Sequence, residues 1–214
     1  MRFGSKVALL GLLAAGTGCG PRYALGVPKE VVSKLPYESR IDLLEAENAL
    51  AVAVDKVDES QNEVLRTRES LRRSRSRLDT AHREQGRAKD AISQEVAKLA
   101  IEEADARIEY LRRRQELNVQ NREIEELAFR CQYARFEASR LAVAQKAKVE
   151  GSERLKPEDF DKQIKDCDAE VTQRRKDTAQ NAQRAEAAKT AWEAKRVAFA
   201  KKTFDARASP YVEL

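Results

Sequence analysis

The 36 carboxylates of this sequence lie at helical spacings among Lys and Arg, as expected for surface ion pairs, and few other side chains have the chemistry that catalysis or metal binding requires. The chain contains one histidine, His82, within a long stretch of helix-forming residues. A catalytic triad needs a base beside a nucleophile, and a zinc site needs three or four clustered ligands, so a single histidine supplies neither. The chain also lacks a glycine-rich phosphate-binding loop. We therefore expect no catalytic, cofactor-binding or metal-binding residues, and no enzymatic activity.

Two of the three cysteines, Cys131 and Cys167, fall on apolar stripes of segments expected to be helical. If the two helices face each other, these thiols can form a disulfide within the chain. A loop centred near residue 153 would leave them roughly 12 Å out of register, at ~1.5 Å per residue. Since a disulfide needs Cα atoms within about 7 Å, the first helix must end early or the loop must be asymmetric. The alternatives are an intermolecular disulfide or two buried free thiols.

A cluster of arginines is the other chemically distinct feature. Residues 66–77 contain six arginines and one glutamate. Guanidinium groups match the geometry of phosphate and carboxylate groups, so the cluster could bind an acidic protein or an anionic envelope polymer. A solvated helix face is the plainer interpretation. No aromatic residue interleaves with the arginines for base stacking, so we expect no nucleic-acid partner. The candidate patch comprises Arg66, Arg68, Arg72, Arg73, Arg75 and Arg77.

The first 20 residues have the pattern of an export signal. Arg2 and Lys6 precede an apolar run at residues 7–15, which is shorter than the roughly 20 residues that span a bilayer. Small residues then lead to Cys19. This pattern resembles a bacterial lipoprotein precursor, in which the cysteine is lipidated and becomes the new N-terminus. The resemblance covers residues 1–20 only, and it departs from the usual pattern at Gly16, where Leu, Val or Ile is common.

The resemblance implies that residues 1–18 are a signal peptide and that Cys19 carries lipid. Several acyl chains hold a protein firmly to a membrane. Gly20, in place of an aspartate after the cysteine, implies sorting to the outer membrane. Removal of Arg2 and Lys6 with the signal lowers the net charge from +5 to +3. A plain secretory signal and an uncleaved membrane anchor are the alternatives.

The helix breakers show where the elements lie. Three prolines within residues 20–40 predict an extended tether over 19–38. Residues 37–150 contain no proline and one glycine, Gly86, and residues 158–209 contain neither. Charged residues make up 36% of the chain, against about 25% in typical globular domains. These features exclude β-sandwiches and barrels and favour long solvated helices.

Apolar residues recur every seven positions, as in a coiled coil. The repeat predicts a helix over 39–148, a loop over 149–156, a second helix over 157–208 and a tail over 209–214. Pro157 suits the first position of the second helix. The series misses at Gln85 and resumes in phase after Gly86. Its members in the first helix are Leu43, Leu50, Val57, Val64, Leu71, Leu78, Ile92 and Leu99.

The predicted fold is all-α, a long antiparallel coiled-coil hairpin. An elongated three-helix bundle with a turn near Gly86 is the alternative. Phe129, Tyr133 and Phe136 point almost opposite to the apolar residues Ile124 and Cys131, so that helix needs two neighbours. In the hairpin, the seam over 43–99 has no partner within the chain and would pair with another chain.

The expected function is that of a scaffold in the bacterial cell envelope. The protein would be anchored by lipid in the outer membrane, face the periplasm and bind other envelope proteins through its coiled-coil seam, with self-association as an option. One alternative is a periplasmic chaperone-like or adaptor protein. If the signal interpretation fails, a cytoplasmic coiled coil associated with nucleic acid is the other alternative.

Overall fold

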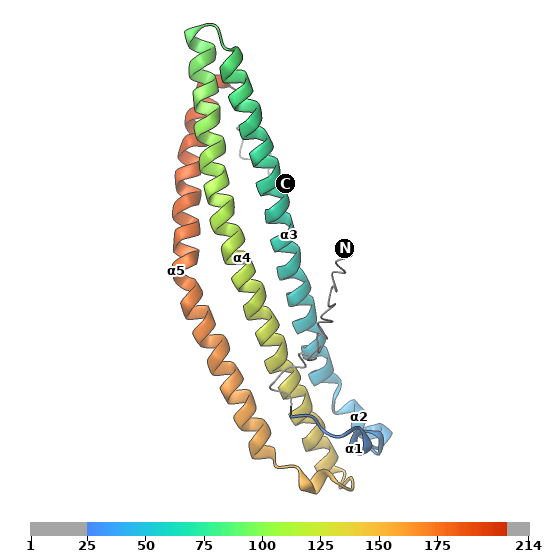
Figure 1. The fold of residues 1–214 in the computed structure, drawn as a ribbon. Helices are drawn as coiled ribbons and strands as arrows, with labels where there is room; N and C mark the ends of the chain where they lie inside the picture. The colour runs from blue at the N-terminus through green and yellow to red at the C-terminus, as the bar shows by residue number, and fades with distance from the viewer. Residues whose placement is uncertain (1–24, 205–214) are drawn as a thin grey trace, which may run out of the picture.

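The chain forms long helices that run side by side along one axis (Figure 1). The computed structural model describes residues 25–204, and no strand occurs among them, so the predicted all-α class is confirmed. The helices are α1 (Lys29–Ser33), α2 (Tyr37–Ile41), α3 (Leu44–Arg87), α4 (Ala91–Lys146) and α5 (Pro157–Thr203), with a 3-10 turn at Ser152–Arg154.

The chain reverses after Arg87, so the single helix predicted over 39–148 is wrong. Ala88 leaves the helical conformation, with φ −67° and ψ 121°. Asp90 then caps α4, since its carboxylate accepts a hydrogen bond of 2.8 Å from the Ser93 N–H. Ile92, which would continue the seven-residue repeat of one helix, is 69% exposed. The structure therefore has the turn near Gly86 that the alternative required.

The three long helices form an open layer with α4 in the middle. Both α3 and α5 pack along α4, and they make no comparable contact with each other. The α4 helix therefore buries two opposite sides, as the two apolar stripes in its sequence predict. Phe136 is buried on one side, and Ile124 and Cys131 are buried on the other. At 1.5 Å per residue, the 56 residues of α4 extend about 84 Å.

The seven-residue repeat of α3 packs against α4 within the same chain. Val64 and Leu71 are buried, together with the small residues Thr67, Ser74 and Ala81. The expectation that this seam lacks an intrachain partner is therefore wrong, because the reversal at 88–90 brings α4 against it. The same repeat in α5 buries Val171, Thr178, Ala185 and Trp192.

The connection from α4 to α5 begins earlier than the sequence predicts. The α4 helix ends at Lys146, two residues before the predicted boundary. Gly151 adopts a φ of 89°, a conformation that residues with a Cβ rarely adopt. Pro157 occupies the start of α5, as predicted. That helix ends at Thr203, where Phe204 has a φ of 51°, rather than at residue 208.

Residues 25–43 fold against one end of the layer, so the extended tether predicted over 19–38 is wrong from residue 25 onward. Val27, Val31 and Leu35 are spaced four apart and bury one apolar stripe. Pro28 and Pro36 stand immediately before α1 and α2, where a proline starts a helix without breaking it. The stripe and Leu43 pack against Leu141, Val143, Ala144, Val149 and Phe160.

Candidate functional site

The structure joins Cys131 of α4 to Cys167 of α5 in a disulfide with a Cα–Cα distance of 5.6 Å. Both residues are buried among Ile124, Leu127 and Val171. The early end of α4 and the asymmetric connection resolve the register difference that the sequence presents. The bond closes a span of 36 residues and fixes α5 to α4 near the connection between them.

A buried carboxylate holds the N-terminal segment against α4. Glu137 is 1% exposed. Its Oε2 accepts a hydrogen bond of 2.8 Å from the Val27 N–H, and its Oε1 accepts one of 2.8 Å from Arg140 Nη1. Tyr133 lies close enough to feel this carboxylate: burial first, and then the negative charge of Glu137, raise the pKa of Tyr133. We call Val27, Tyr133, Glu137 and Arg140 the N-terminal clasp.

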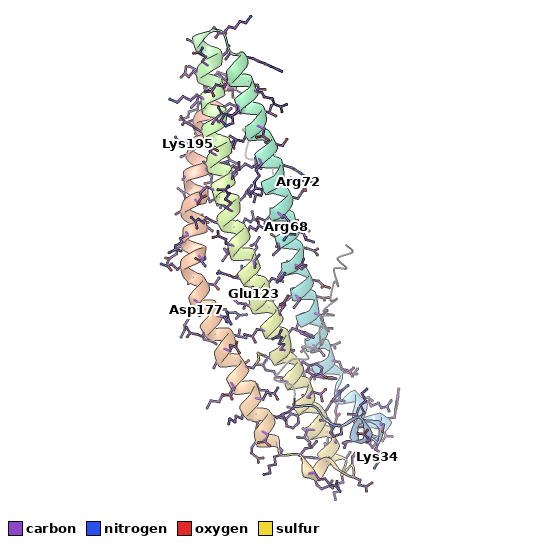
Figure 2. All side chains as sticks on the ribbon, in the orientation of Figure 1. Lys34, Arg68, Arg72, Glu123, Asp177 and Lys195 are labelled. Carbon is purple, nitrogen blue, oxygen red and sulfur yellow. A yellow bond between two sulfur atoms is a disulfide. The ribbon has the colours of Figure 1, made fainter. Side chains whose placement is uncertain are left out.

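Surface ion pairs support the clasp on either side. Lys34 of the N-terminal segment pairs with Glu150 at 2.8 Å, and Lys146 pairs with Asp42 at 2.9 Å. Lys34 lies at the lower end of the layer in Figure 2. The Lys34 ammonium group, by hydrogen bonding and by its charge, lowers the pKa of Glu150. Exposed pairs of this kind stabilise a protein only weakly, because water screens the two charges. The buried Glu137 is therefore the principal polar fastening.

An apolar cavity of about 690 Å³ opens beside the clasp. Its wall is formed by α1, α2, the start of α3 and Arg140. Tyr37, Ile41 and Leu44 are its most exposed apolar residues, and Tyr37 is 79% exposed. The charged residues of its lining are Lys29, Arg40, Glu47 and Arg140, of which Arg140 is paired with Glu137.

The structure does not gather the six arginines of the candidate patch on one surface. The seam of α3 separates them, so Arg66, Arg73 and Arg77 line a groove with Arg107 and Arg114 of α4. Arg75 lies in a second groove with Arg112. Arg68 and Arg72 are exposed on α3 (Figure 2), and the Arg72 side chain is 81% exposed. The six arginines therefore lie on several sides of α3 rather than on one surface.

Some of these arginines are neutralised within α3. Arg66 pairs with Glu63 at 3.1 Å, and Arg72 and Arg73 pair with Glu69 at 2.9 and 3.0 Å. Hydrogen bonds from Arg73 and then Arg72 lower the pKa of Glu69. Among residues 25–204, no ion pair joins Arg68, Arg75 or Arg77 to an acidic group.

The remaining predicted features divide into those within and those outside the described residues. His82 is exposed on α3. Within 25–204, no group of three or more His, Cys, Asp or Glu residues is arranged to hold a metal ion. No helix in that part of the chain is long and apolar enough to cross a membrane. Cys19, the signal at 1–18 and the tail at 209–214 lie outside the described residues.

The role of Glu137 is not apparent from the residue types and their spacing. The available signal was its position between Phe136 and Ala138, on the same helix side as Tyr133 and Arg140, within an apolar stretch. A carboxylate there requires buried partners. The partner from the N-terminal segment is a backbone N–H, which leaves no mark in the residue types.

Comparison with protein-family models, with curated proteins and with solved structures finds no match for this chain.

Proposed function

We propose that this chain is an exported lipoprotein that is anchored through Cys19 and serves as a rigid spacer and binding scaffold of the cell envelope. The anchor would lie in the outer membrane, and the rod would extend into the periplasm. The lipoprotein-like pattern at residues 1–20 supports export and lipid anchoring, and the disulfide Cys131–Cys167 fits an oxidising compartment.

The observation that carries the proposal is the N-terminal clasp. The packed segment begins within a few residues of Cys19, since the Val27 N–H already donates to the buried Glu137. A lipid at Cys19 would therefore be connected to one end of the rod by a short stretch of chain. A displacement of the anchor would be transmitted through the clasp to α4, which extends about 84 Å from end to end.

The surface of the rod supports a role in binding other proteins by contact. The described residues place charged groups along both open faces of the layer. The chaperone-like alternative relies on a vacant apolar seam that clasps a client. That alternative gains no support from α3, because α4 occupies its seam.

The test of the proposal is metabolic labelling with a fatty acid in a Gram-negative host, followed by separation of the membranes. The wild-type chain is compared with Cys19→Ala. We expect label on the wild type alone, in the outer-membrane fraction, with residues 1–18 removed. Unlabelled wild type that retains Met1 in the cytosol would overturn both the anchor and the location.

A further inference from the structure

The two halves of α3 carry net charges of opposite sign. Residues 44–65 contain six acidic residues and one lysine, a net charge of −5. Residues 66–87 contain eight arginines and three acidic residues, a net charge of +5. The helix has 44 residues, so each half has 22, and the sign changes at the midpoint, next to Leu65. A partner with the opposite distribution of charge would complement both halves at once.

The side of α3 that faces away from α4 carries this division. Val64, Leu71 and Ser74 mark the side packed on α4. At about 100° per residue, the opposite side carries apolar residues near its middle and its N-terminus, acidic residues before Leu65, and Glu69 followed by arginines after it. Leu65 is 47% exposed at the edge of this side, where it also lines the groove between α3 and α4. The outer side includes Leu44, Glu47, Ala51, Val54, Asp58, Leu65, Glu69, Arg72 and Arg83.

Several charges of α3 have no partner of opposite charge in the described structure, whereas Arg72 pairs with Glu69 at 2.9 Å within the helix. Among residues 25–204, Glu47, Asp55 and Asp58 form no ion pair, and neither do Arg68 and Arg83. The α3 helix is also an outer helix of the layer, and α5 lies on the far side of α4 (Figure 1). The described part of the chain therefore leaves a long, exposed helix face with complementary halves.

We propose that two copies of this chain pair through the outer faces of α3, antiparallel and centred on Leu65. The two-fold axis then places Leu65 against the partner's Leu65. Asp58 faces the partner's Arg72, and Glu47 faces the partner's Arg83, because each pair is equidistant from the centre. Each contact occurs twice, as in every isologous interface. A parallel pair would oppose charges of the same sign along its whole length, which costs free energy.

The pairing depends more on charge than on apolar burial. Leu44, Ala51, Val54 and Leu65 are the apolar residues of the outer side, and they do not form a continuous stripe. Ion pairs at an exposed interface are screened by salt, with a Debye length of about 8 Å at physiological ionic strength. The dimer should therefore dissociate as the salt concentration rises.

One consequence rests on the proposed function, whereas the pairing itself does not. Antiparallel pairing separates the two N-terminal clasps by roughly the length of α3, about 66 Å. Two lipid anchors would then lie at opposite ends of the dimer, so the pair would lie along one membrane or join two. The Cys19→Ala chain carries no lipid, so measuring the pairing in this chain tests the dimer independently of the lipid anchor.

The first test is cross-linking at the two-fold axis. The full chain carrying Cys19→Ala and Leu65→Cys is purified in mild detergent and oxidised at low salt. Its other cysteines are joined to each other, so a covalent dimer reports the contact at residue 65. The matched control is Ala187→Cys on the exposed side of α5. We expect a dimer for Leu65→Cys alone; a monomer, or equal cross-linking of the control, would overturn the proposal.

The direction of pairing is tested with two further variants in the same Cys19→Ala chain. Glu47→Cys and Arg83→Cys each place a thiol far from the centre, on opposite halves of α3. In the antiparallel pair, neither variant cross-links with itself, but a mixture of the two does. Self-cross-linking of Glu47→Cys would show a parallel arrangement and contradict the proposal.

The charge pairing is tested by reversal and restoration in sedimentation experiments. Asp58→Arg and Arg72→Asp should each weaken the dimer about tenfold, since two copies of one contact are lost. The chain carrying both changes should recover the original Kd within about threefold. Helix content by circular dichroism separates weaker pairing from unfolding. Two outcomes would overturn the proposed interface: failure of the double variant to recover, or a Kd unchanged between about 50 and 500 mM NaCl.

Discussion

At the scale of single residues, the two fastenings of the rod are both buried and both near the connection of α4 to α5. Glu137 binds the segment that leads to Cys19, and the disulfide Cys131–Cys167 binds α5. A buried carboxylate costs free energy unless its oxygens are satisfied, and here a backbone N–H and a guanidinium satisfy them. Removing one member therefore harms the others.

We predict that Glu137→Ala destabilises the protein by about 3 kcal/mol and releases the N-terminal segment. The substitution leaves the buried Val27 N–H and the Arg140 guanidinium without their acceptor. Urea unfolding measures the loss, and hydrogen exchange at residues 27–35 reports the release. Glu123→Ala, on an exposed face of α4 (Figure 2), should change stability by less than about 0.5 kcal/mol. Equal effects of the two substitutions would contradict this role of Glu137.

We predict that opening the disulfide lowers the free energy of unfolding by about 4 kcal/mol. The bond closes a span of 36 residues, and the loss of that constraint gives the unfolded chain more conformations. Urea unfolding with and without a reductant measures the change. The double variant Cys131→Ala/Cys167→Ala is the control, because a reductant should not affect it. An unfolding free energy of the wild type that the reductant leaves unchanged would contradict the prediction.

At the scale of elements, the turn at 88–90 decides the architecture. The seven-residue repeat continues in phase past Gly86 in the sequence, yet the reversal leaves its next member, Ile92, 69% exposed, so the repeat alone does not reveal the turn. The cap formed by Asp90 favours the reversal, since its carboxylate accepts hydrogen bonds from the backbone N–H and the hydroxyl of Ser93. Those hydrogen bonds, first from the hydroxyl and then from the N–H, lower the pKa of Asp90.

We predict that Asp90→Ala lowers the Tm by about 3 °C at neutral pH, since a helix cap is lost. The pKa of Asp90 is lower in the folded chain than in the unfolded chain. Its stabilisation is therefore complete above the ordinary carboxyl pKa and is lost as the pH falls through the lowered value. The Tm difference between wild type and Asp90→Ala should vanish at acidic pH. A constant difference across pH would show that the charge does not contribute.

The sequence predicts the elements that depend on local periodicity, and it fails where distant segments meet. The repeat through Val171, Thr178 and Ala185 identifies the buried side of α5, and Pro157 identifies its start. The packing of Val27 on Glu137 spans 110 positions and uses a backbone donor, so no residue spacing reveals it. Proline-rich composition similarly suggests a tether, although Pro28 begins a helix there. The six arginines were grouped by position along the chain, but the seam of α3 divides them.

At the scale of the whole molecule, the layer has two unequal interfaces. The α4–α5 interface contains the disulfide and Trp192, whose ring stacks on Tyr110 at 5.4 Å and whose Nε1 donates to Glu103 at 2.7 Å. The α3–α4 interface has no covalent bond, and several of its buried residues are small or polar, such as Thr67, Ser74 and Ala81. Because α3 and α5 scarcely touch, each can separate from α4 alone.

We therefore predict that α3 opens before α5 in native-state hydrogen exchange. Regions with fewer buried apolar contacts open at lower free energy, so amides of α3 should lose protection at urea concentrations where α5 stays protected. Reduction of the disulfide tests whether this bond causes the difference, because it should lower the protection of α5 and leave that of α3 nearly unchanged. If both outer helices exchanged together in the oxidised protein, the layer would be one cooperative unit. The rod would then transmit displacement from the N-terminal clasp through all three helices rather than through α4 and α5.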